Sequence, residues 1–509
     1  MSRAARAARR CAWGASCLLA PLLAPASLPA QDYRLRLDVR GQAVSFRGVE
    51  EDSVSRSLVA AGPTGGLVSP DGFAVTCTGS NPFCRYFRPG PVHRAGPVVA
   101  SADLTLWGLG VTGLRVRLHS RAALDLGDSV AAWPLTSPAL QLLEGYAEYA
   151  TGPWVARAGR LLLADRLGFT GLDGGRVAWR GAGGVEAEAY LGWGLGRAVG
   201  LPVSSPALNP LDDFQPRDRQ IVAGAAAGWR GRLLDARLDY RREVDPAADA
   251  FTLERAAASL ALRPARWWNV ELDADYDLAQ GWVGSAEGRV RYTRPAVSLI
   301  AGARRYRPHF DLWTIWGEFS PVPYHAFHGS AWLTPASRWQ LRLHGERFVY
   351  ENSETSTPLV DVEDRGWRVG AGVTFRPDDR WTIDAEHQAE FGPGASSTGL
   401  EGRVSWQPSA AIALTAHAAT LVRPLELRLS DAHLRLAGLE AEWRLGDRFR
   451  AGAGATRLWE DRERPDAAAI DWSQTRLHAR VTMLLGSGAD RTTLPPARPR
   501  QRPRGSGRT

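Results

Sequence analysis

The sequence predicts an all-β protein built as one large antiparallel β-barrel, and two patterns along the chain predict it. The first is strict alternation of polar and apolar residues: positions 269–277 read NVELDADYD, which places every polar side chain on one face of a strand. The second is a sorting of the connections into short turns and longer polar segments. The same alternation recurs in residues 115–121, 235–241, 285–293, 338–346, 381–391, 401–407 and 476–485.

The short turns contain Pro, Gly or Asp, and several are followed by an aromatic residue, as in RPARW at 263–267 and RPDDRW at 376–381. Together with a first strand from about 33 and a last strand that ends near 485, they predict about 22 strands, within 18 to 24. Segment 307–326 is interpreted either as a loop or as an additional strand. The ten short turns lie near residues 110, 152, 182, 230, 265, 294, 335, 378, 409 and 446.

Longer polar segments, such as 196–218, 351–362 and 459–470, separate these hairpins. Short turns at one rim and long loops at the other are typical of a transmembrane antiparallel β-barrel with periplasmic turns and extracellular loops. We therefore expect Trp267, Trp339, Trp381 and Phe449, which follow short turns, at the periplasmic membrane interface. The phase of alternation changes between Arg435 and Glu440, which predicts a β-bulge at 437–438.

The main alternative is a soluble β-repeat protein such as a propeller, whose apolar face would be a packed core rich in Val, Ile and Leu. Here the apolar face consists of Ala, Leu, Val and Gly, with Trp or Tyr near the strand ends. An aromatic girdle explains this distribution better. After residue 30 no run of eighteen apolar residues occurs, so helical membrane spans are not expected.

Residues 1–30 read as a secretory signal peptide, with four arginines, an apolar stretch from 12 to 23, and Leu-Pro-Ala before the expected cleavage site at Gln31. Residues 487–509 are expected to form a disordered tail rich in Pro and Arg. The leader carries +4 and the tail +5 of the formal charge of +8, which leaves −1 for residues 31–486. The basic character therefore does not indicate nucleic-acid binding.

Cys77 and Cys84 are the two cysteines outside the leader, and their spacing in an exported protein predicts a disulfide that closes a small loop. We expect residues 48–97 to form a long loop of the barrel domain, which covers 31–486. This segment is too short for the folded plug domain of an energised receptor. Whether it enters the lumen decides between an open and a blocked pore.

Residues 144–180 carry a more specific pattern: EGYAEY at 144–149, a Gly-Pro turn at 152–153, RAGR at 157–160, and LDGGRV at 172–177. This pattern resembles porin-like outer-membrane channels, notably the alginate-export type. The resemblance implies a channel in the bacterial outer membrane and specifies no substrate. The last strand ends near Leu485 without a terminal aromatic residue, unlike typical outer-membrane barrels.

If the apolar faces meet lipid, the polar faces line the lumen. The arginines alone would suggest an anion-selective pore, but acidic residues on neighbouring strands favour structural pairing across the wall. The candidate pore-lining residues are Arg115, Arg117, His119, Arg160, Arg237, Arg241, Glu271, Asp273, Asp275, Arg289, Arg291, Arg342, His344, Asp384, Glu386, Arg403, Arg476 and Arg480.

The sequence therefore predicts a porin-like channel for diffusion or export of polar or charged solutes. The alternative is a structural or surface-binding barrel whose extracellular loops carry the function. We find no catalytic constellation, metal site or cofactor motif, and expect no enzyme activity. The expected partners are outer-membrane lipid, the barrel-assembly machinery, and small polar solutes or an exported polymer. The oligomeric state is left open.

Overall fold

The computed structural model describes residues 32–62, 66–127, 140–195, 220–246, 250–307, 323–351, 365–392, 397–423, 432–462 and 472–486. The expected leader and tail, and most of the segment 307–326, lie outside these ranges. Almost all described residues belong to strands. Within the described residues, no helix has the length and apolar character needed to cross a bilayer.

The first part of the chain contains the elements β1 (Asp32–Ser55), η1 (Arg56–Leu58), β2 (Ala60–Ala61), β3 (Leu67–Val68), β4 (Val75–Thr76), β5 (Phe83–Ala95), β6 (Pro97–Trp107), β7 (Leu114–Asp125), β8 (Leu140–Thr151), β9 (Trp154–Asp165), β10 (Gly168–Arg180), η2 (Ala182–Gly184), β11 (Val185–Gly194), β12 (Ile221–Arg230), β13 (Leu234–Asp245) and β14 (Ala250–Ala265). The second part contains β15 (Trp268–Asp277), β16 (Trp282–Arg294), β17 (Val297–Tyr306), β18 (Tyr324–Ala336), β19 (Trp339–Tyr350), β20 (Arg365–Phe375), β21 (Trp381–Phe391), β22 (Ser397–Ser409), β23 (Ile412–Arg423), β24 (Ala432–Leu445), β25 (Phe449–Arg462) and β26 (Trp472–Gly486).

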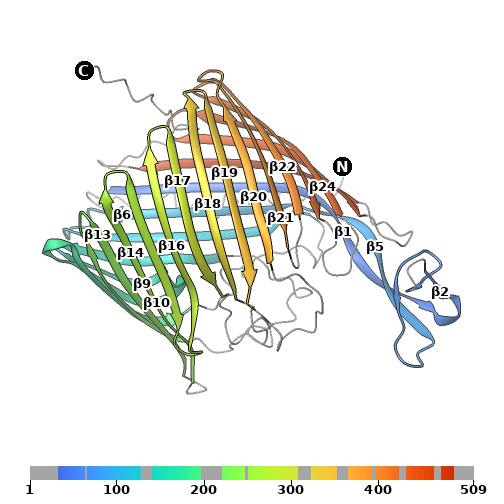
Figure 1. Ribbon diagram of the computed structural model, residues 1–509, viewed down its shortest axis with the longest axis horizontal. Helices are drawn as coiled ribbons and strands as arrows, with labels where there is room; N and C mark the ends of the chain where they lie inside the picture. The colour runs from blue at the N-terminus through green and yellow to red at the C-terminus, as the bar shows by residue number, and fades with distance from the viewer. Residues whose placement is uncertain are drawn as a thin grey trace, which may run out of the picture.

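One closed sheet organises the molecule (Figure 1). From β6 to β26 each strand pairs with the next in antiparallel order, and β1 pairs with both β6 and β26, which closes the circle. The barrel thus has 22 strands, which confirms the predicted fold class and strand number. The ten predicted short turns are also confirmed, and they share one rim with the ends of the described chain at Asp32 and Gly486.

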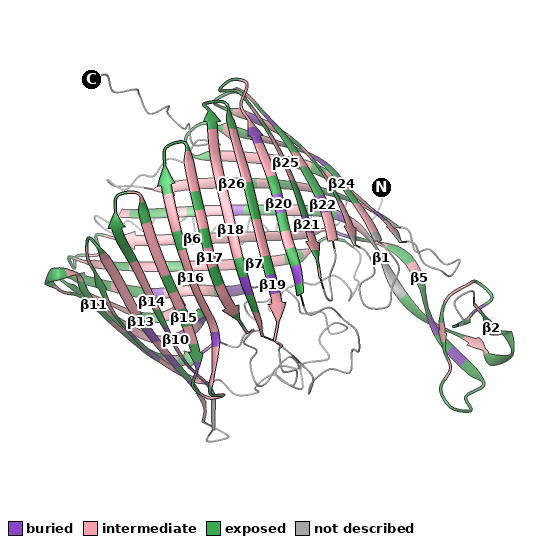
Figure 2. Ribbon diagram, viewed as in Figure 1, coloured by how far each residue is buried: buried purple, intermediate pink, exposed green. Residues whose placement is uncertain are grey.

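The two faces of the wall differ in polarity, as the alternation predicts. In β26 and β1, Asp38 and Arg480 form an ion pair on the inner face, whereas Val39 and Val481 are exposed on the outer face. Figure 2 shows the alternation of exposed and less exposed residues along the strands. Because large apolar side chains such as Leu238, Leu343 and Leu439 are more than 45% exposed, the outer face is apolar and unpacked.

Exposed aromatic residues form two belts on this outer face. The belt near the short turns contains Trp154, Trp229, Trp268, Trp339, Trp381, Trp406, Trp443 and Phe449, and the belt near the long loops contains Trp193, Tyr276, Phe327, Trp367 and Phe391. Neighbouring rings contact each other across strands: the Trp381 and Trp406 ring centroids are 5.6 Å apart. The short-turn belt includes three of the four aromatic residues expected there, and Trp267 lies in a short turn beside it.

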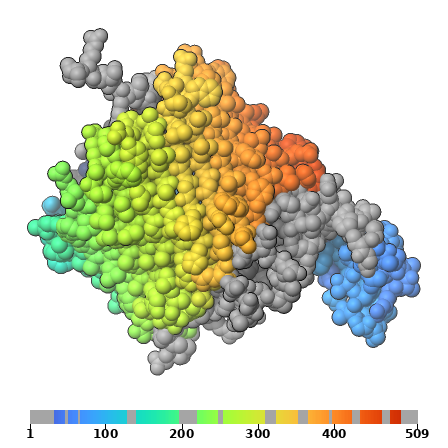
Figure 3. Space-filling view, viewed as in Figure 1, coloured from blue at the N-terminus to red at the C-terminus, as the bar shows by residue number. Residues whose placement is uncertain are grey.

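The segment 48–97 is a β-hairpin arm instead of the predicted loop. Beyond Val44, β1 leaves the barrel and pairs only with β5, down to Ser55 and Phe83. The expected disulfide joins Cys77 and Cys84 at the far end of the arm, beside β4. Figures 1 and 3 show the blue arm projecting away from the long-loop rim, so the described part of this segment does not enter the lumen. The segment is an arm and not the predicted loop because its backbone pairs regularly: β1 runs as one strand from the barrel wall into the arm, where it pairs with β5.

The bulge predicted at 437–438 is wrong. β24 pairs with β23 and β25 in uninterrupted register through Ala437 and Gly438. His433 and Arg435 therefore lie on the outer face, while Glu440 and Glu442 lie on the inner face. Arg435 remains partnered there through Asp461, 3.5 Å away. The polar residues change face because β24 leaves the apolar band near the long-loop rim.

The arm and the barrel are separable in this fold, which gives a first prediction. Replacing both Cys77 and Cys84 by Ser should increase proteolysis of the arm but leave barrel closure intact. Closure depends on the β1–β26 and β1–β6 pairings, which lie in the barrel wall and not in the arm. The measurement is heat-modifiable migration on gels beside limited proteolysis. Loss of the compact unheated band in the double variant would show that the arm is needed for closure.

Candidate functional site

The candidate functional site is the lumen, whose wall carries dense ion pairs, both between strands and along one strand. Arg342 on β19 lies 2.8 Å from Asp384 and 3.0 Å from Glu386 on β21. Arg368 on β20 bridges Glu346 at 2.7 Å and Glu390 at 2.8 Å. Opposite charges on adjacent strands stabilise such a wall because each charge keeps hydrogen-bond partners.

The structure places 17 of the 18 candidate pore-lining residues on the inner face, following the register from Asp38 and Arg480 around the wall. Arg160 is the exception and needs a correction. It faces the opposite side from Arg157 and binds Asp173 through two hydrogen bonds of 2.8 and 3.0 Å. Its place in the Gly-Arg motif does not fix its face, and alternation along β9 shows that Gly159 and Leu161 occupy the inner positions instead.

Most of the candidates on the inner face are paired. The arginine–acid contacts are Arg117 with Asp103 and Glu144, Arg237 with Asp239, Arg289 with Glu271, Arg342 with Asp384 and Glu386, Arg403 with Glu401, Arg480 with Asp38, and Arg241 with Glu243. Asp273 and Asp275 pair with Arg166 and Arg255. Arg115, His119, Arg291, His344 and Arg476 lie on the same face, where His344 packs over Gly370 and Arg476 donates to Gln474 at 3.2 Å.

The hairpin β9–β10 interrupts the open lumen, because its tip folds inward. Arg166, in the two-residue turn, pairs with Asp273 on β15, five strands away from β10. The carbonyl of Leu167 accepts hydrogen bonds from Arg241 on β13 at 2.7 Å and from Arg255 on β14 at 3.4 Å. All three partners are inner-face residues, so the tip lies inside the barrel.

Glycines on facing positions of three strands, β9, β10 and β11, permit this fold. Tyr146 faces Gly159, Gly159 faces Gly174, and Gly174 faces Gly192. A Cβ at Gly159, whose φ is 132°, would lie 2.3 Å from a backbone oxygen, and one at Gly174 would lie 2.1 Å from another. The strands approach each other closely here, and the hairpin bends into the lumen beyond this row.

Apolar packing holds the folded hairpin against the wall. Leu161, Leu163 and Leu172 are at most 7% exposed and form a cluster with Tyr190 of β11 and Val222 of β12. Burying a leucine side chain contributes about 1.5–3 kcal/mol, so three of them stabilise the docked hairpin substantially. This cluster is an apolar core inside a lumen that is otherwise charged.

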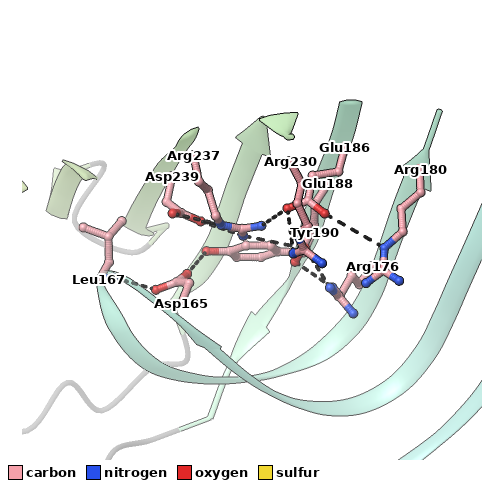
Figure 4. Close-up of polar contacts among 10 residues, drawn as sticks. All are labelled: Asp165, Leu167, Arg176, Arg180, Glu186, Glu188, Tyr190, Arg230, Arg237 and Asp239. Carbon is pink, nitrogen blue, oxygen red and sulfur yellow. Dashed lines mark hydrogen bonds and ion pairs between the residues drawn. The ribbon is translucent and has the colours of Figure 1, made fainter. Parts of the chain in front are cut away.

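A polar network continues from this core toward the short-turn rim (Figure 4). Arg176 binds Glu188 through two hydrogen bonds of 2.6 Å, and Arg237 lies between Glu188 at 3.8 Å and Asp239 at 2.7 Å. Figure 4 shows Tyr190 pointing toward Asp165, to whose carboxylate it donates at 3.4 Å.

The other carboxylate oxygen of Asp165 accepts the backbone N–H of Leu167 at 2.8 Å. Tyr190 therefore connects the hairpin tip to the β11 wall through Asp165.

The opposite wall is open to water. On β1 and β22 the inner-face side chains of Arg40, Glu401 and Arg403 are 59, 59 and 56% exposed. By contrast, Arg241 and Asp239 beneath the hairpin are 3% exposed or less. The described residues thus leave the water-accessible part of the lumen beside β21, β22 and β1.

Sequence reasoning missed the residues that the hairpin tip brings together. Arg166, Arg255 and Arg307 were not chosen, because their importance depends on contacts between strands far apart in the chain. The density of glycine at 145, 159, 174 and 192 was the available signal. Among the described residues no group of three or more His, Cys, Asp and Glu side chains is arranged to hold a metal ion.

Comparisons with known proteins were made for the whole chain. No family model and no curated protein match, so the local resemblance to alginate-export channels is not shown. Similar solved structures include OccK3 (OpdO) of Pseudomonas aeruginosa, with 8% identity, coverage of 90% of this chain and 96% of that one, and a TM-score of 0.36.

The outer membrane protein OpdK of Pseudomonas aeruginosa is 10% identical, with 90% and 99% coverage and a TM-score of 0.37. A mutant of the ferric enterobactin receptor PfeA of the same organism is 12% identical, with 89% and 80% coverage and a TM-score of 0.45. These values are too low to carry an argument about function. The class is defined by the chain's own fold: a closed 22-stranded β-barrel with an apolar outside and a charged lumen.

The docked hairpin can be tested with a charge placed in its core. Leu161→Asp should release the hairpin, since an unpaired carboxylate among Leu163, Leu172 and Tyr190 loses its hydration. Trypsin should then cleave after Arg166, as detected by mass spectrometry. The matched control is Leu162→Asp, because Leu162 lies on the other face and is 51% exposed. Equal cleavage in both variants would contradict the inward docking.

At the long-loop rim, Glu351 joins the ends of two strands. It accepts hydrogen bonds from Arg305 at 2.6 and 3.1 Å and lies 2.8 Å from His325. The hydrogen bonds from Arg305 hold the pKa of Glu351 below its usual range. Such a carboxyl stabilises the folded state above its unfolded pKa, and the contribution is lost as the pH falls through the lower folded pKa.

We therefore expect these strand ends to stay protected from hydrogen exchange above the ordinary pKa of a glutamate and to lose protection as the pH falls through the lower folded pKa. Glu351→Gln should lose this local protection already at neutral pH. Exchange at the ends of β17 and β18 is the measurement, with the ends of β22 as the internal control. A pH-independent pattern in the unmodified protein would contradict the assignment.

Proposed function

We propose that this protein is a channel of the bacterial outer membrane through which polar or charged solutes diffuse or are exported. The observation that carries the proposal is the combination of a closed wall, an exposed apolar outer face between two aromatic belts, and a charged inner face that water reaches. A bilayer accepts a sheet only when closure satisfies all backbone groups.

The spacing of the belts supports a membrane location. Trp268 and Tyr276 are eight residues apart on β15, and Trp381 and Phe391 are ten residues apart on β21. At about 3.4 Å per residue these spans are about 27 to 34 Å, or about 21 to 26 Å along the barrel axis at a tilt of about 40°. The apolar band of outer-membrane barrels is about 25 Å tall, which agrees.

The rims support an orientation. Short turns and the described chain ends share one rim, which in this class faces the periplasm. The arm lies at the other rim, together with the strand ends that the longer connections join, and this rim faces the outside. The hairpin tip enters the lumen from this outer rim and narrows it on the side of β10 to β15.

The pairing of the wall charges favours a pore with weak intrinsic ion selectivity. Most arginines of the inner face contact a carboxylate, so neither sign of charge dominates the wall as a whole.

The projecting arm supports the second candidate, a barrel that binds a surface partner, because it exposes Leu58, Phe83 and Phe87 beyond the rim. The arm and the pore are compatible in one molecule.

Reconstitution into planar bilayers tests the channel. Discrete conductance steps are expected, and Arg403→Gln should shift the reversal potential in a salt gradient toward cation preference, because Glu401 then loses its partner at the water-exposed wall. The control Arg435→Gln removes an arginine from the outer face and should leave the reversal potential unchanged. Absence of discrete conductance from correctly folded protein would refute the proposal.

A further inference from the structure

A cavity of about 330 Å³ lies where the tip of the hairpin β9–β10 meets the inner wall. Liquid water occupies about 30 Å³ per molecule, so the space exceeds that of a single water. Four strand ends and the tip contribute to its lining, among them Phe169, Arg241, Arg255, Asp275 and Arg307. The cavity therefore gathers three guanidinium groups and one carboxylate.

Arg241 is 2% exposed, and its terminal nitrogens are used to hold the hairpin. They donate to the Thr170 hydroxyl and to the Leu167 carbonyl. Its Nε is buried without a hydrogen-bond acceptor, 3.8 Å from the Glu243 carboxylate. A buried charge-bearing donor without an acceptor is costly, so the charge of Arg241 is only partly compensated by its protein contacts.

Arg255 and Arg307 line the same cavity, and each of them also has a buried Nε without an acceptor. Arg255 is 9% exposed and donates to Asp275 at 2.9 Å, yet its Nε is also buried without an acceptor. The guanidinium of Arg307 lies 3.4 Å above the Trp282 ring, and its Nε has no acceptor either. Burial, with repulsion from Arg305, lowers the pKa of Arg307 more than the nearby carboxylates of Glu351 and Asp277 raise it.

Arginine Nε atoms without acceptors also occur elsewhere in the barrel, for example at Arg117 and Arg304. Those residues do not line this cavity, and Arg117 faces two carboxylates. The difference here is that three such arginines line one space, whose lining holds a single carboxylate, Asp275, already bonded to Arg255 and to the Ser285 hydroxyl. The lining thus has an excess of positive charge.

We propose that this cavity binds the carboxylate or phosphate group of a small anionic solute. Guanidinium groups recognise both oxyanions through charge-assisted hydrogen bonds, and three of them line this cavity against a single carboxylate. The inference rests on the proposed function, since the site would select solutes during their passage. It adds a local anion preference to a wall that is balanced elsewhere.

The test is calorimetric binding to the full chain in detergent, with succinate, inorganic phosphate and the neutral isostere succinamide as probes. Succinate or phosphate should bind and succinamide should not, and the affinity should fall as ionic strength rises. Arg307→Gln should weaken binding at least about tenfold, because it removes a charge-assisted contact. Arg307→Lys, which keeps the charge, should restore part of it.

The matched control is Arg289→Gln, a lumenal arginine already paired with Glu271, which should leave the affinity unchanged. The hydrogen bonds that hold the Leu167 carbonyl come from Arg241 and Arg255, so the hairpin should stay docked in the Arg307 variants, as checked by trypsin resistance at Arg166. Binding by succinate alone or phosphate alone identifies the group recognised. Equal binding of succinamide, no binding of any probe, or an unchanged Arg307→Gln variant would overturn the site.

The anion-binding test and the conductance test can fail independently of each other. Anion binding without conductance would refute the channel while keeping the site. Conductance without anion binding would refute the site while keeping the channel.

Discussion

Closure of the hydrogen-bonded sheet is the constraint on which the rest of this structure depends. β1 pairs with β26 on one side and with β6 on the other, so no edge strand remains in the barrel wall. In a bilayer an unpaired backbone group costs several kcal/mol, and closure removes that cost for every strand at once. Closure also fixes which residues face inward, since each register position alternates between lumen and lipid.

The charged lumen follows from that alternation. An inner face of arginines alone would repel itself, and the chain instead places acids at facing or diagonal positions, as with Arg368 between Glu346 and Glu390. The wall gains hydrogen bonds while the water-exposed side near Glu401 and Arg403 stays accessible. Because positive and negative charges are paired along most of the wall, ion selectivity must arise where one sign of charge is in local excess.

Positive charge is in local excess beside the inward hairpin β9–β10. Close strand approach at Gly159 and Gly174 permits the bend, and Leu161 and Leu172 provide an apolar face that packs onto Tyr190. The bend carries the Leu167 carbonyl to Arg241 and Arg255, and both arginines line the cavity. One local feature of backbone geometry thus narrows the lumen and concentrates positive charge.

The sequence by itself determined the barrel, its strand number, the two rims and the inner face of 17 candidate residues, because all depend on period-two alternation and turn chemistry within each hairpin. Only the tertiary structure decided that 48–97 forms a projecting arm, that β24 has no bulge, and that Arg166 reaches Asp273. These depend on contacts between strands far apart in the chain. Local periodicity carries no information about which inner-face residues meet across a lumen.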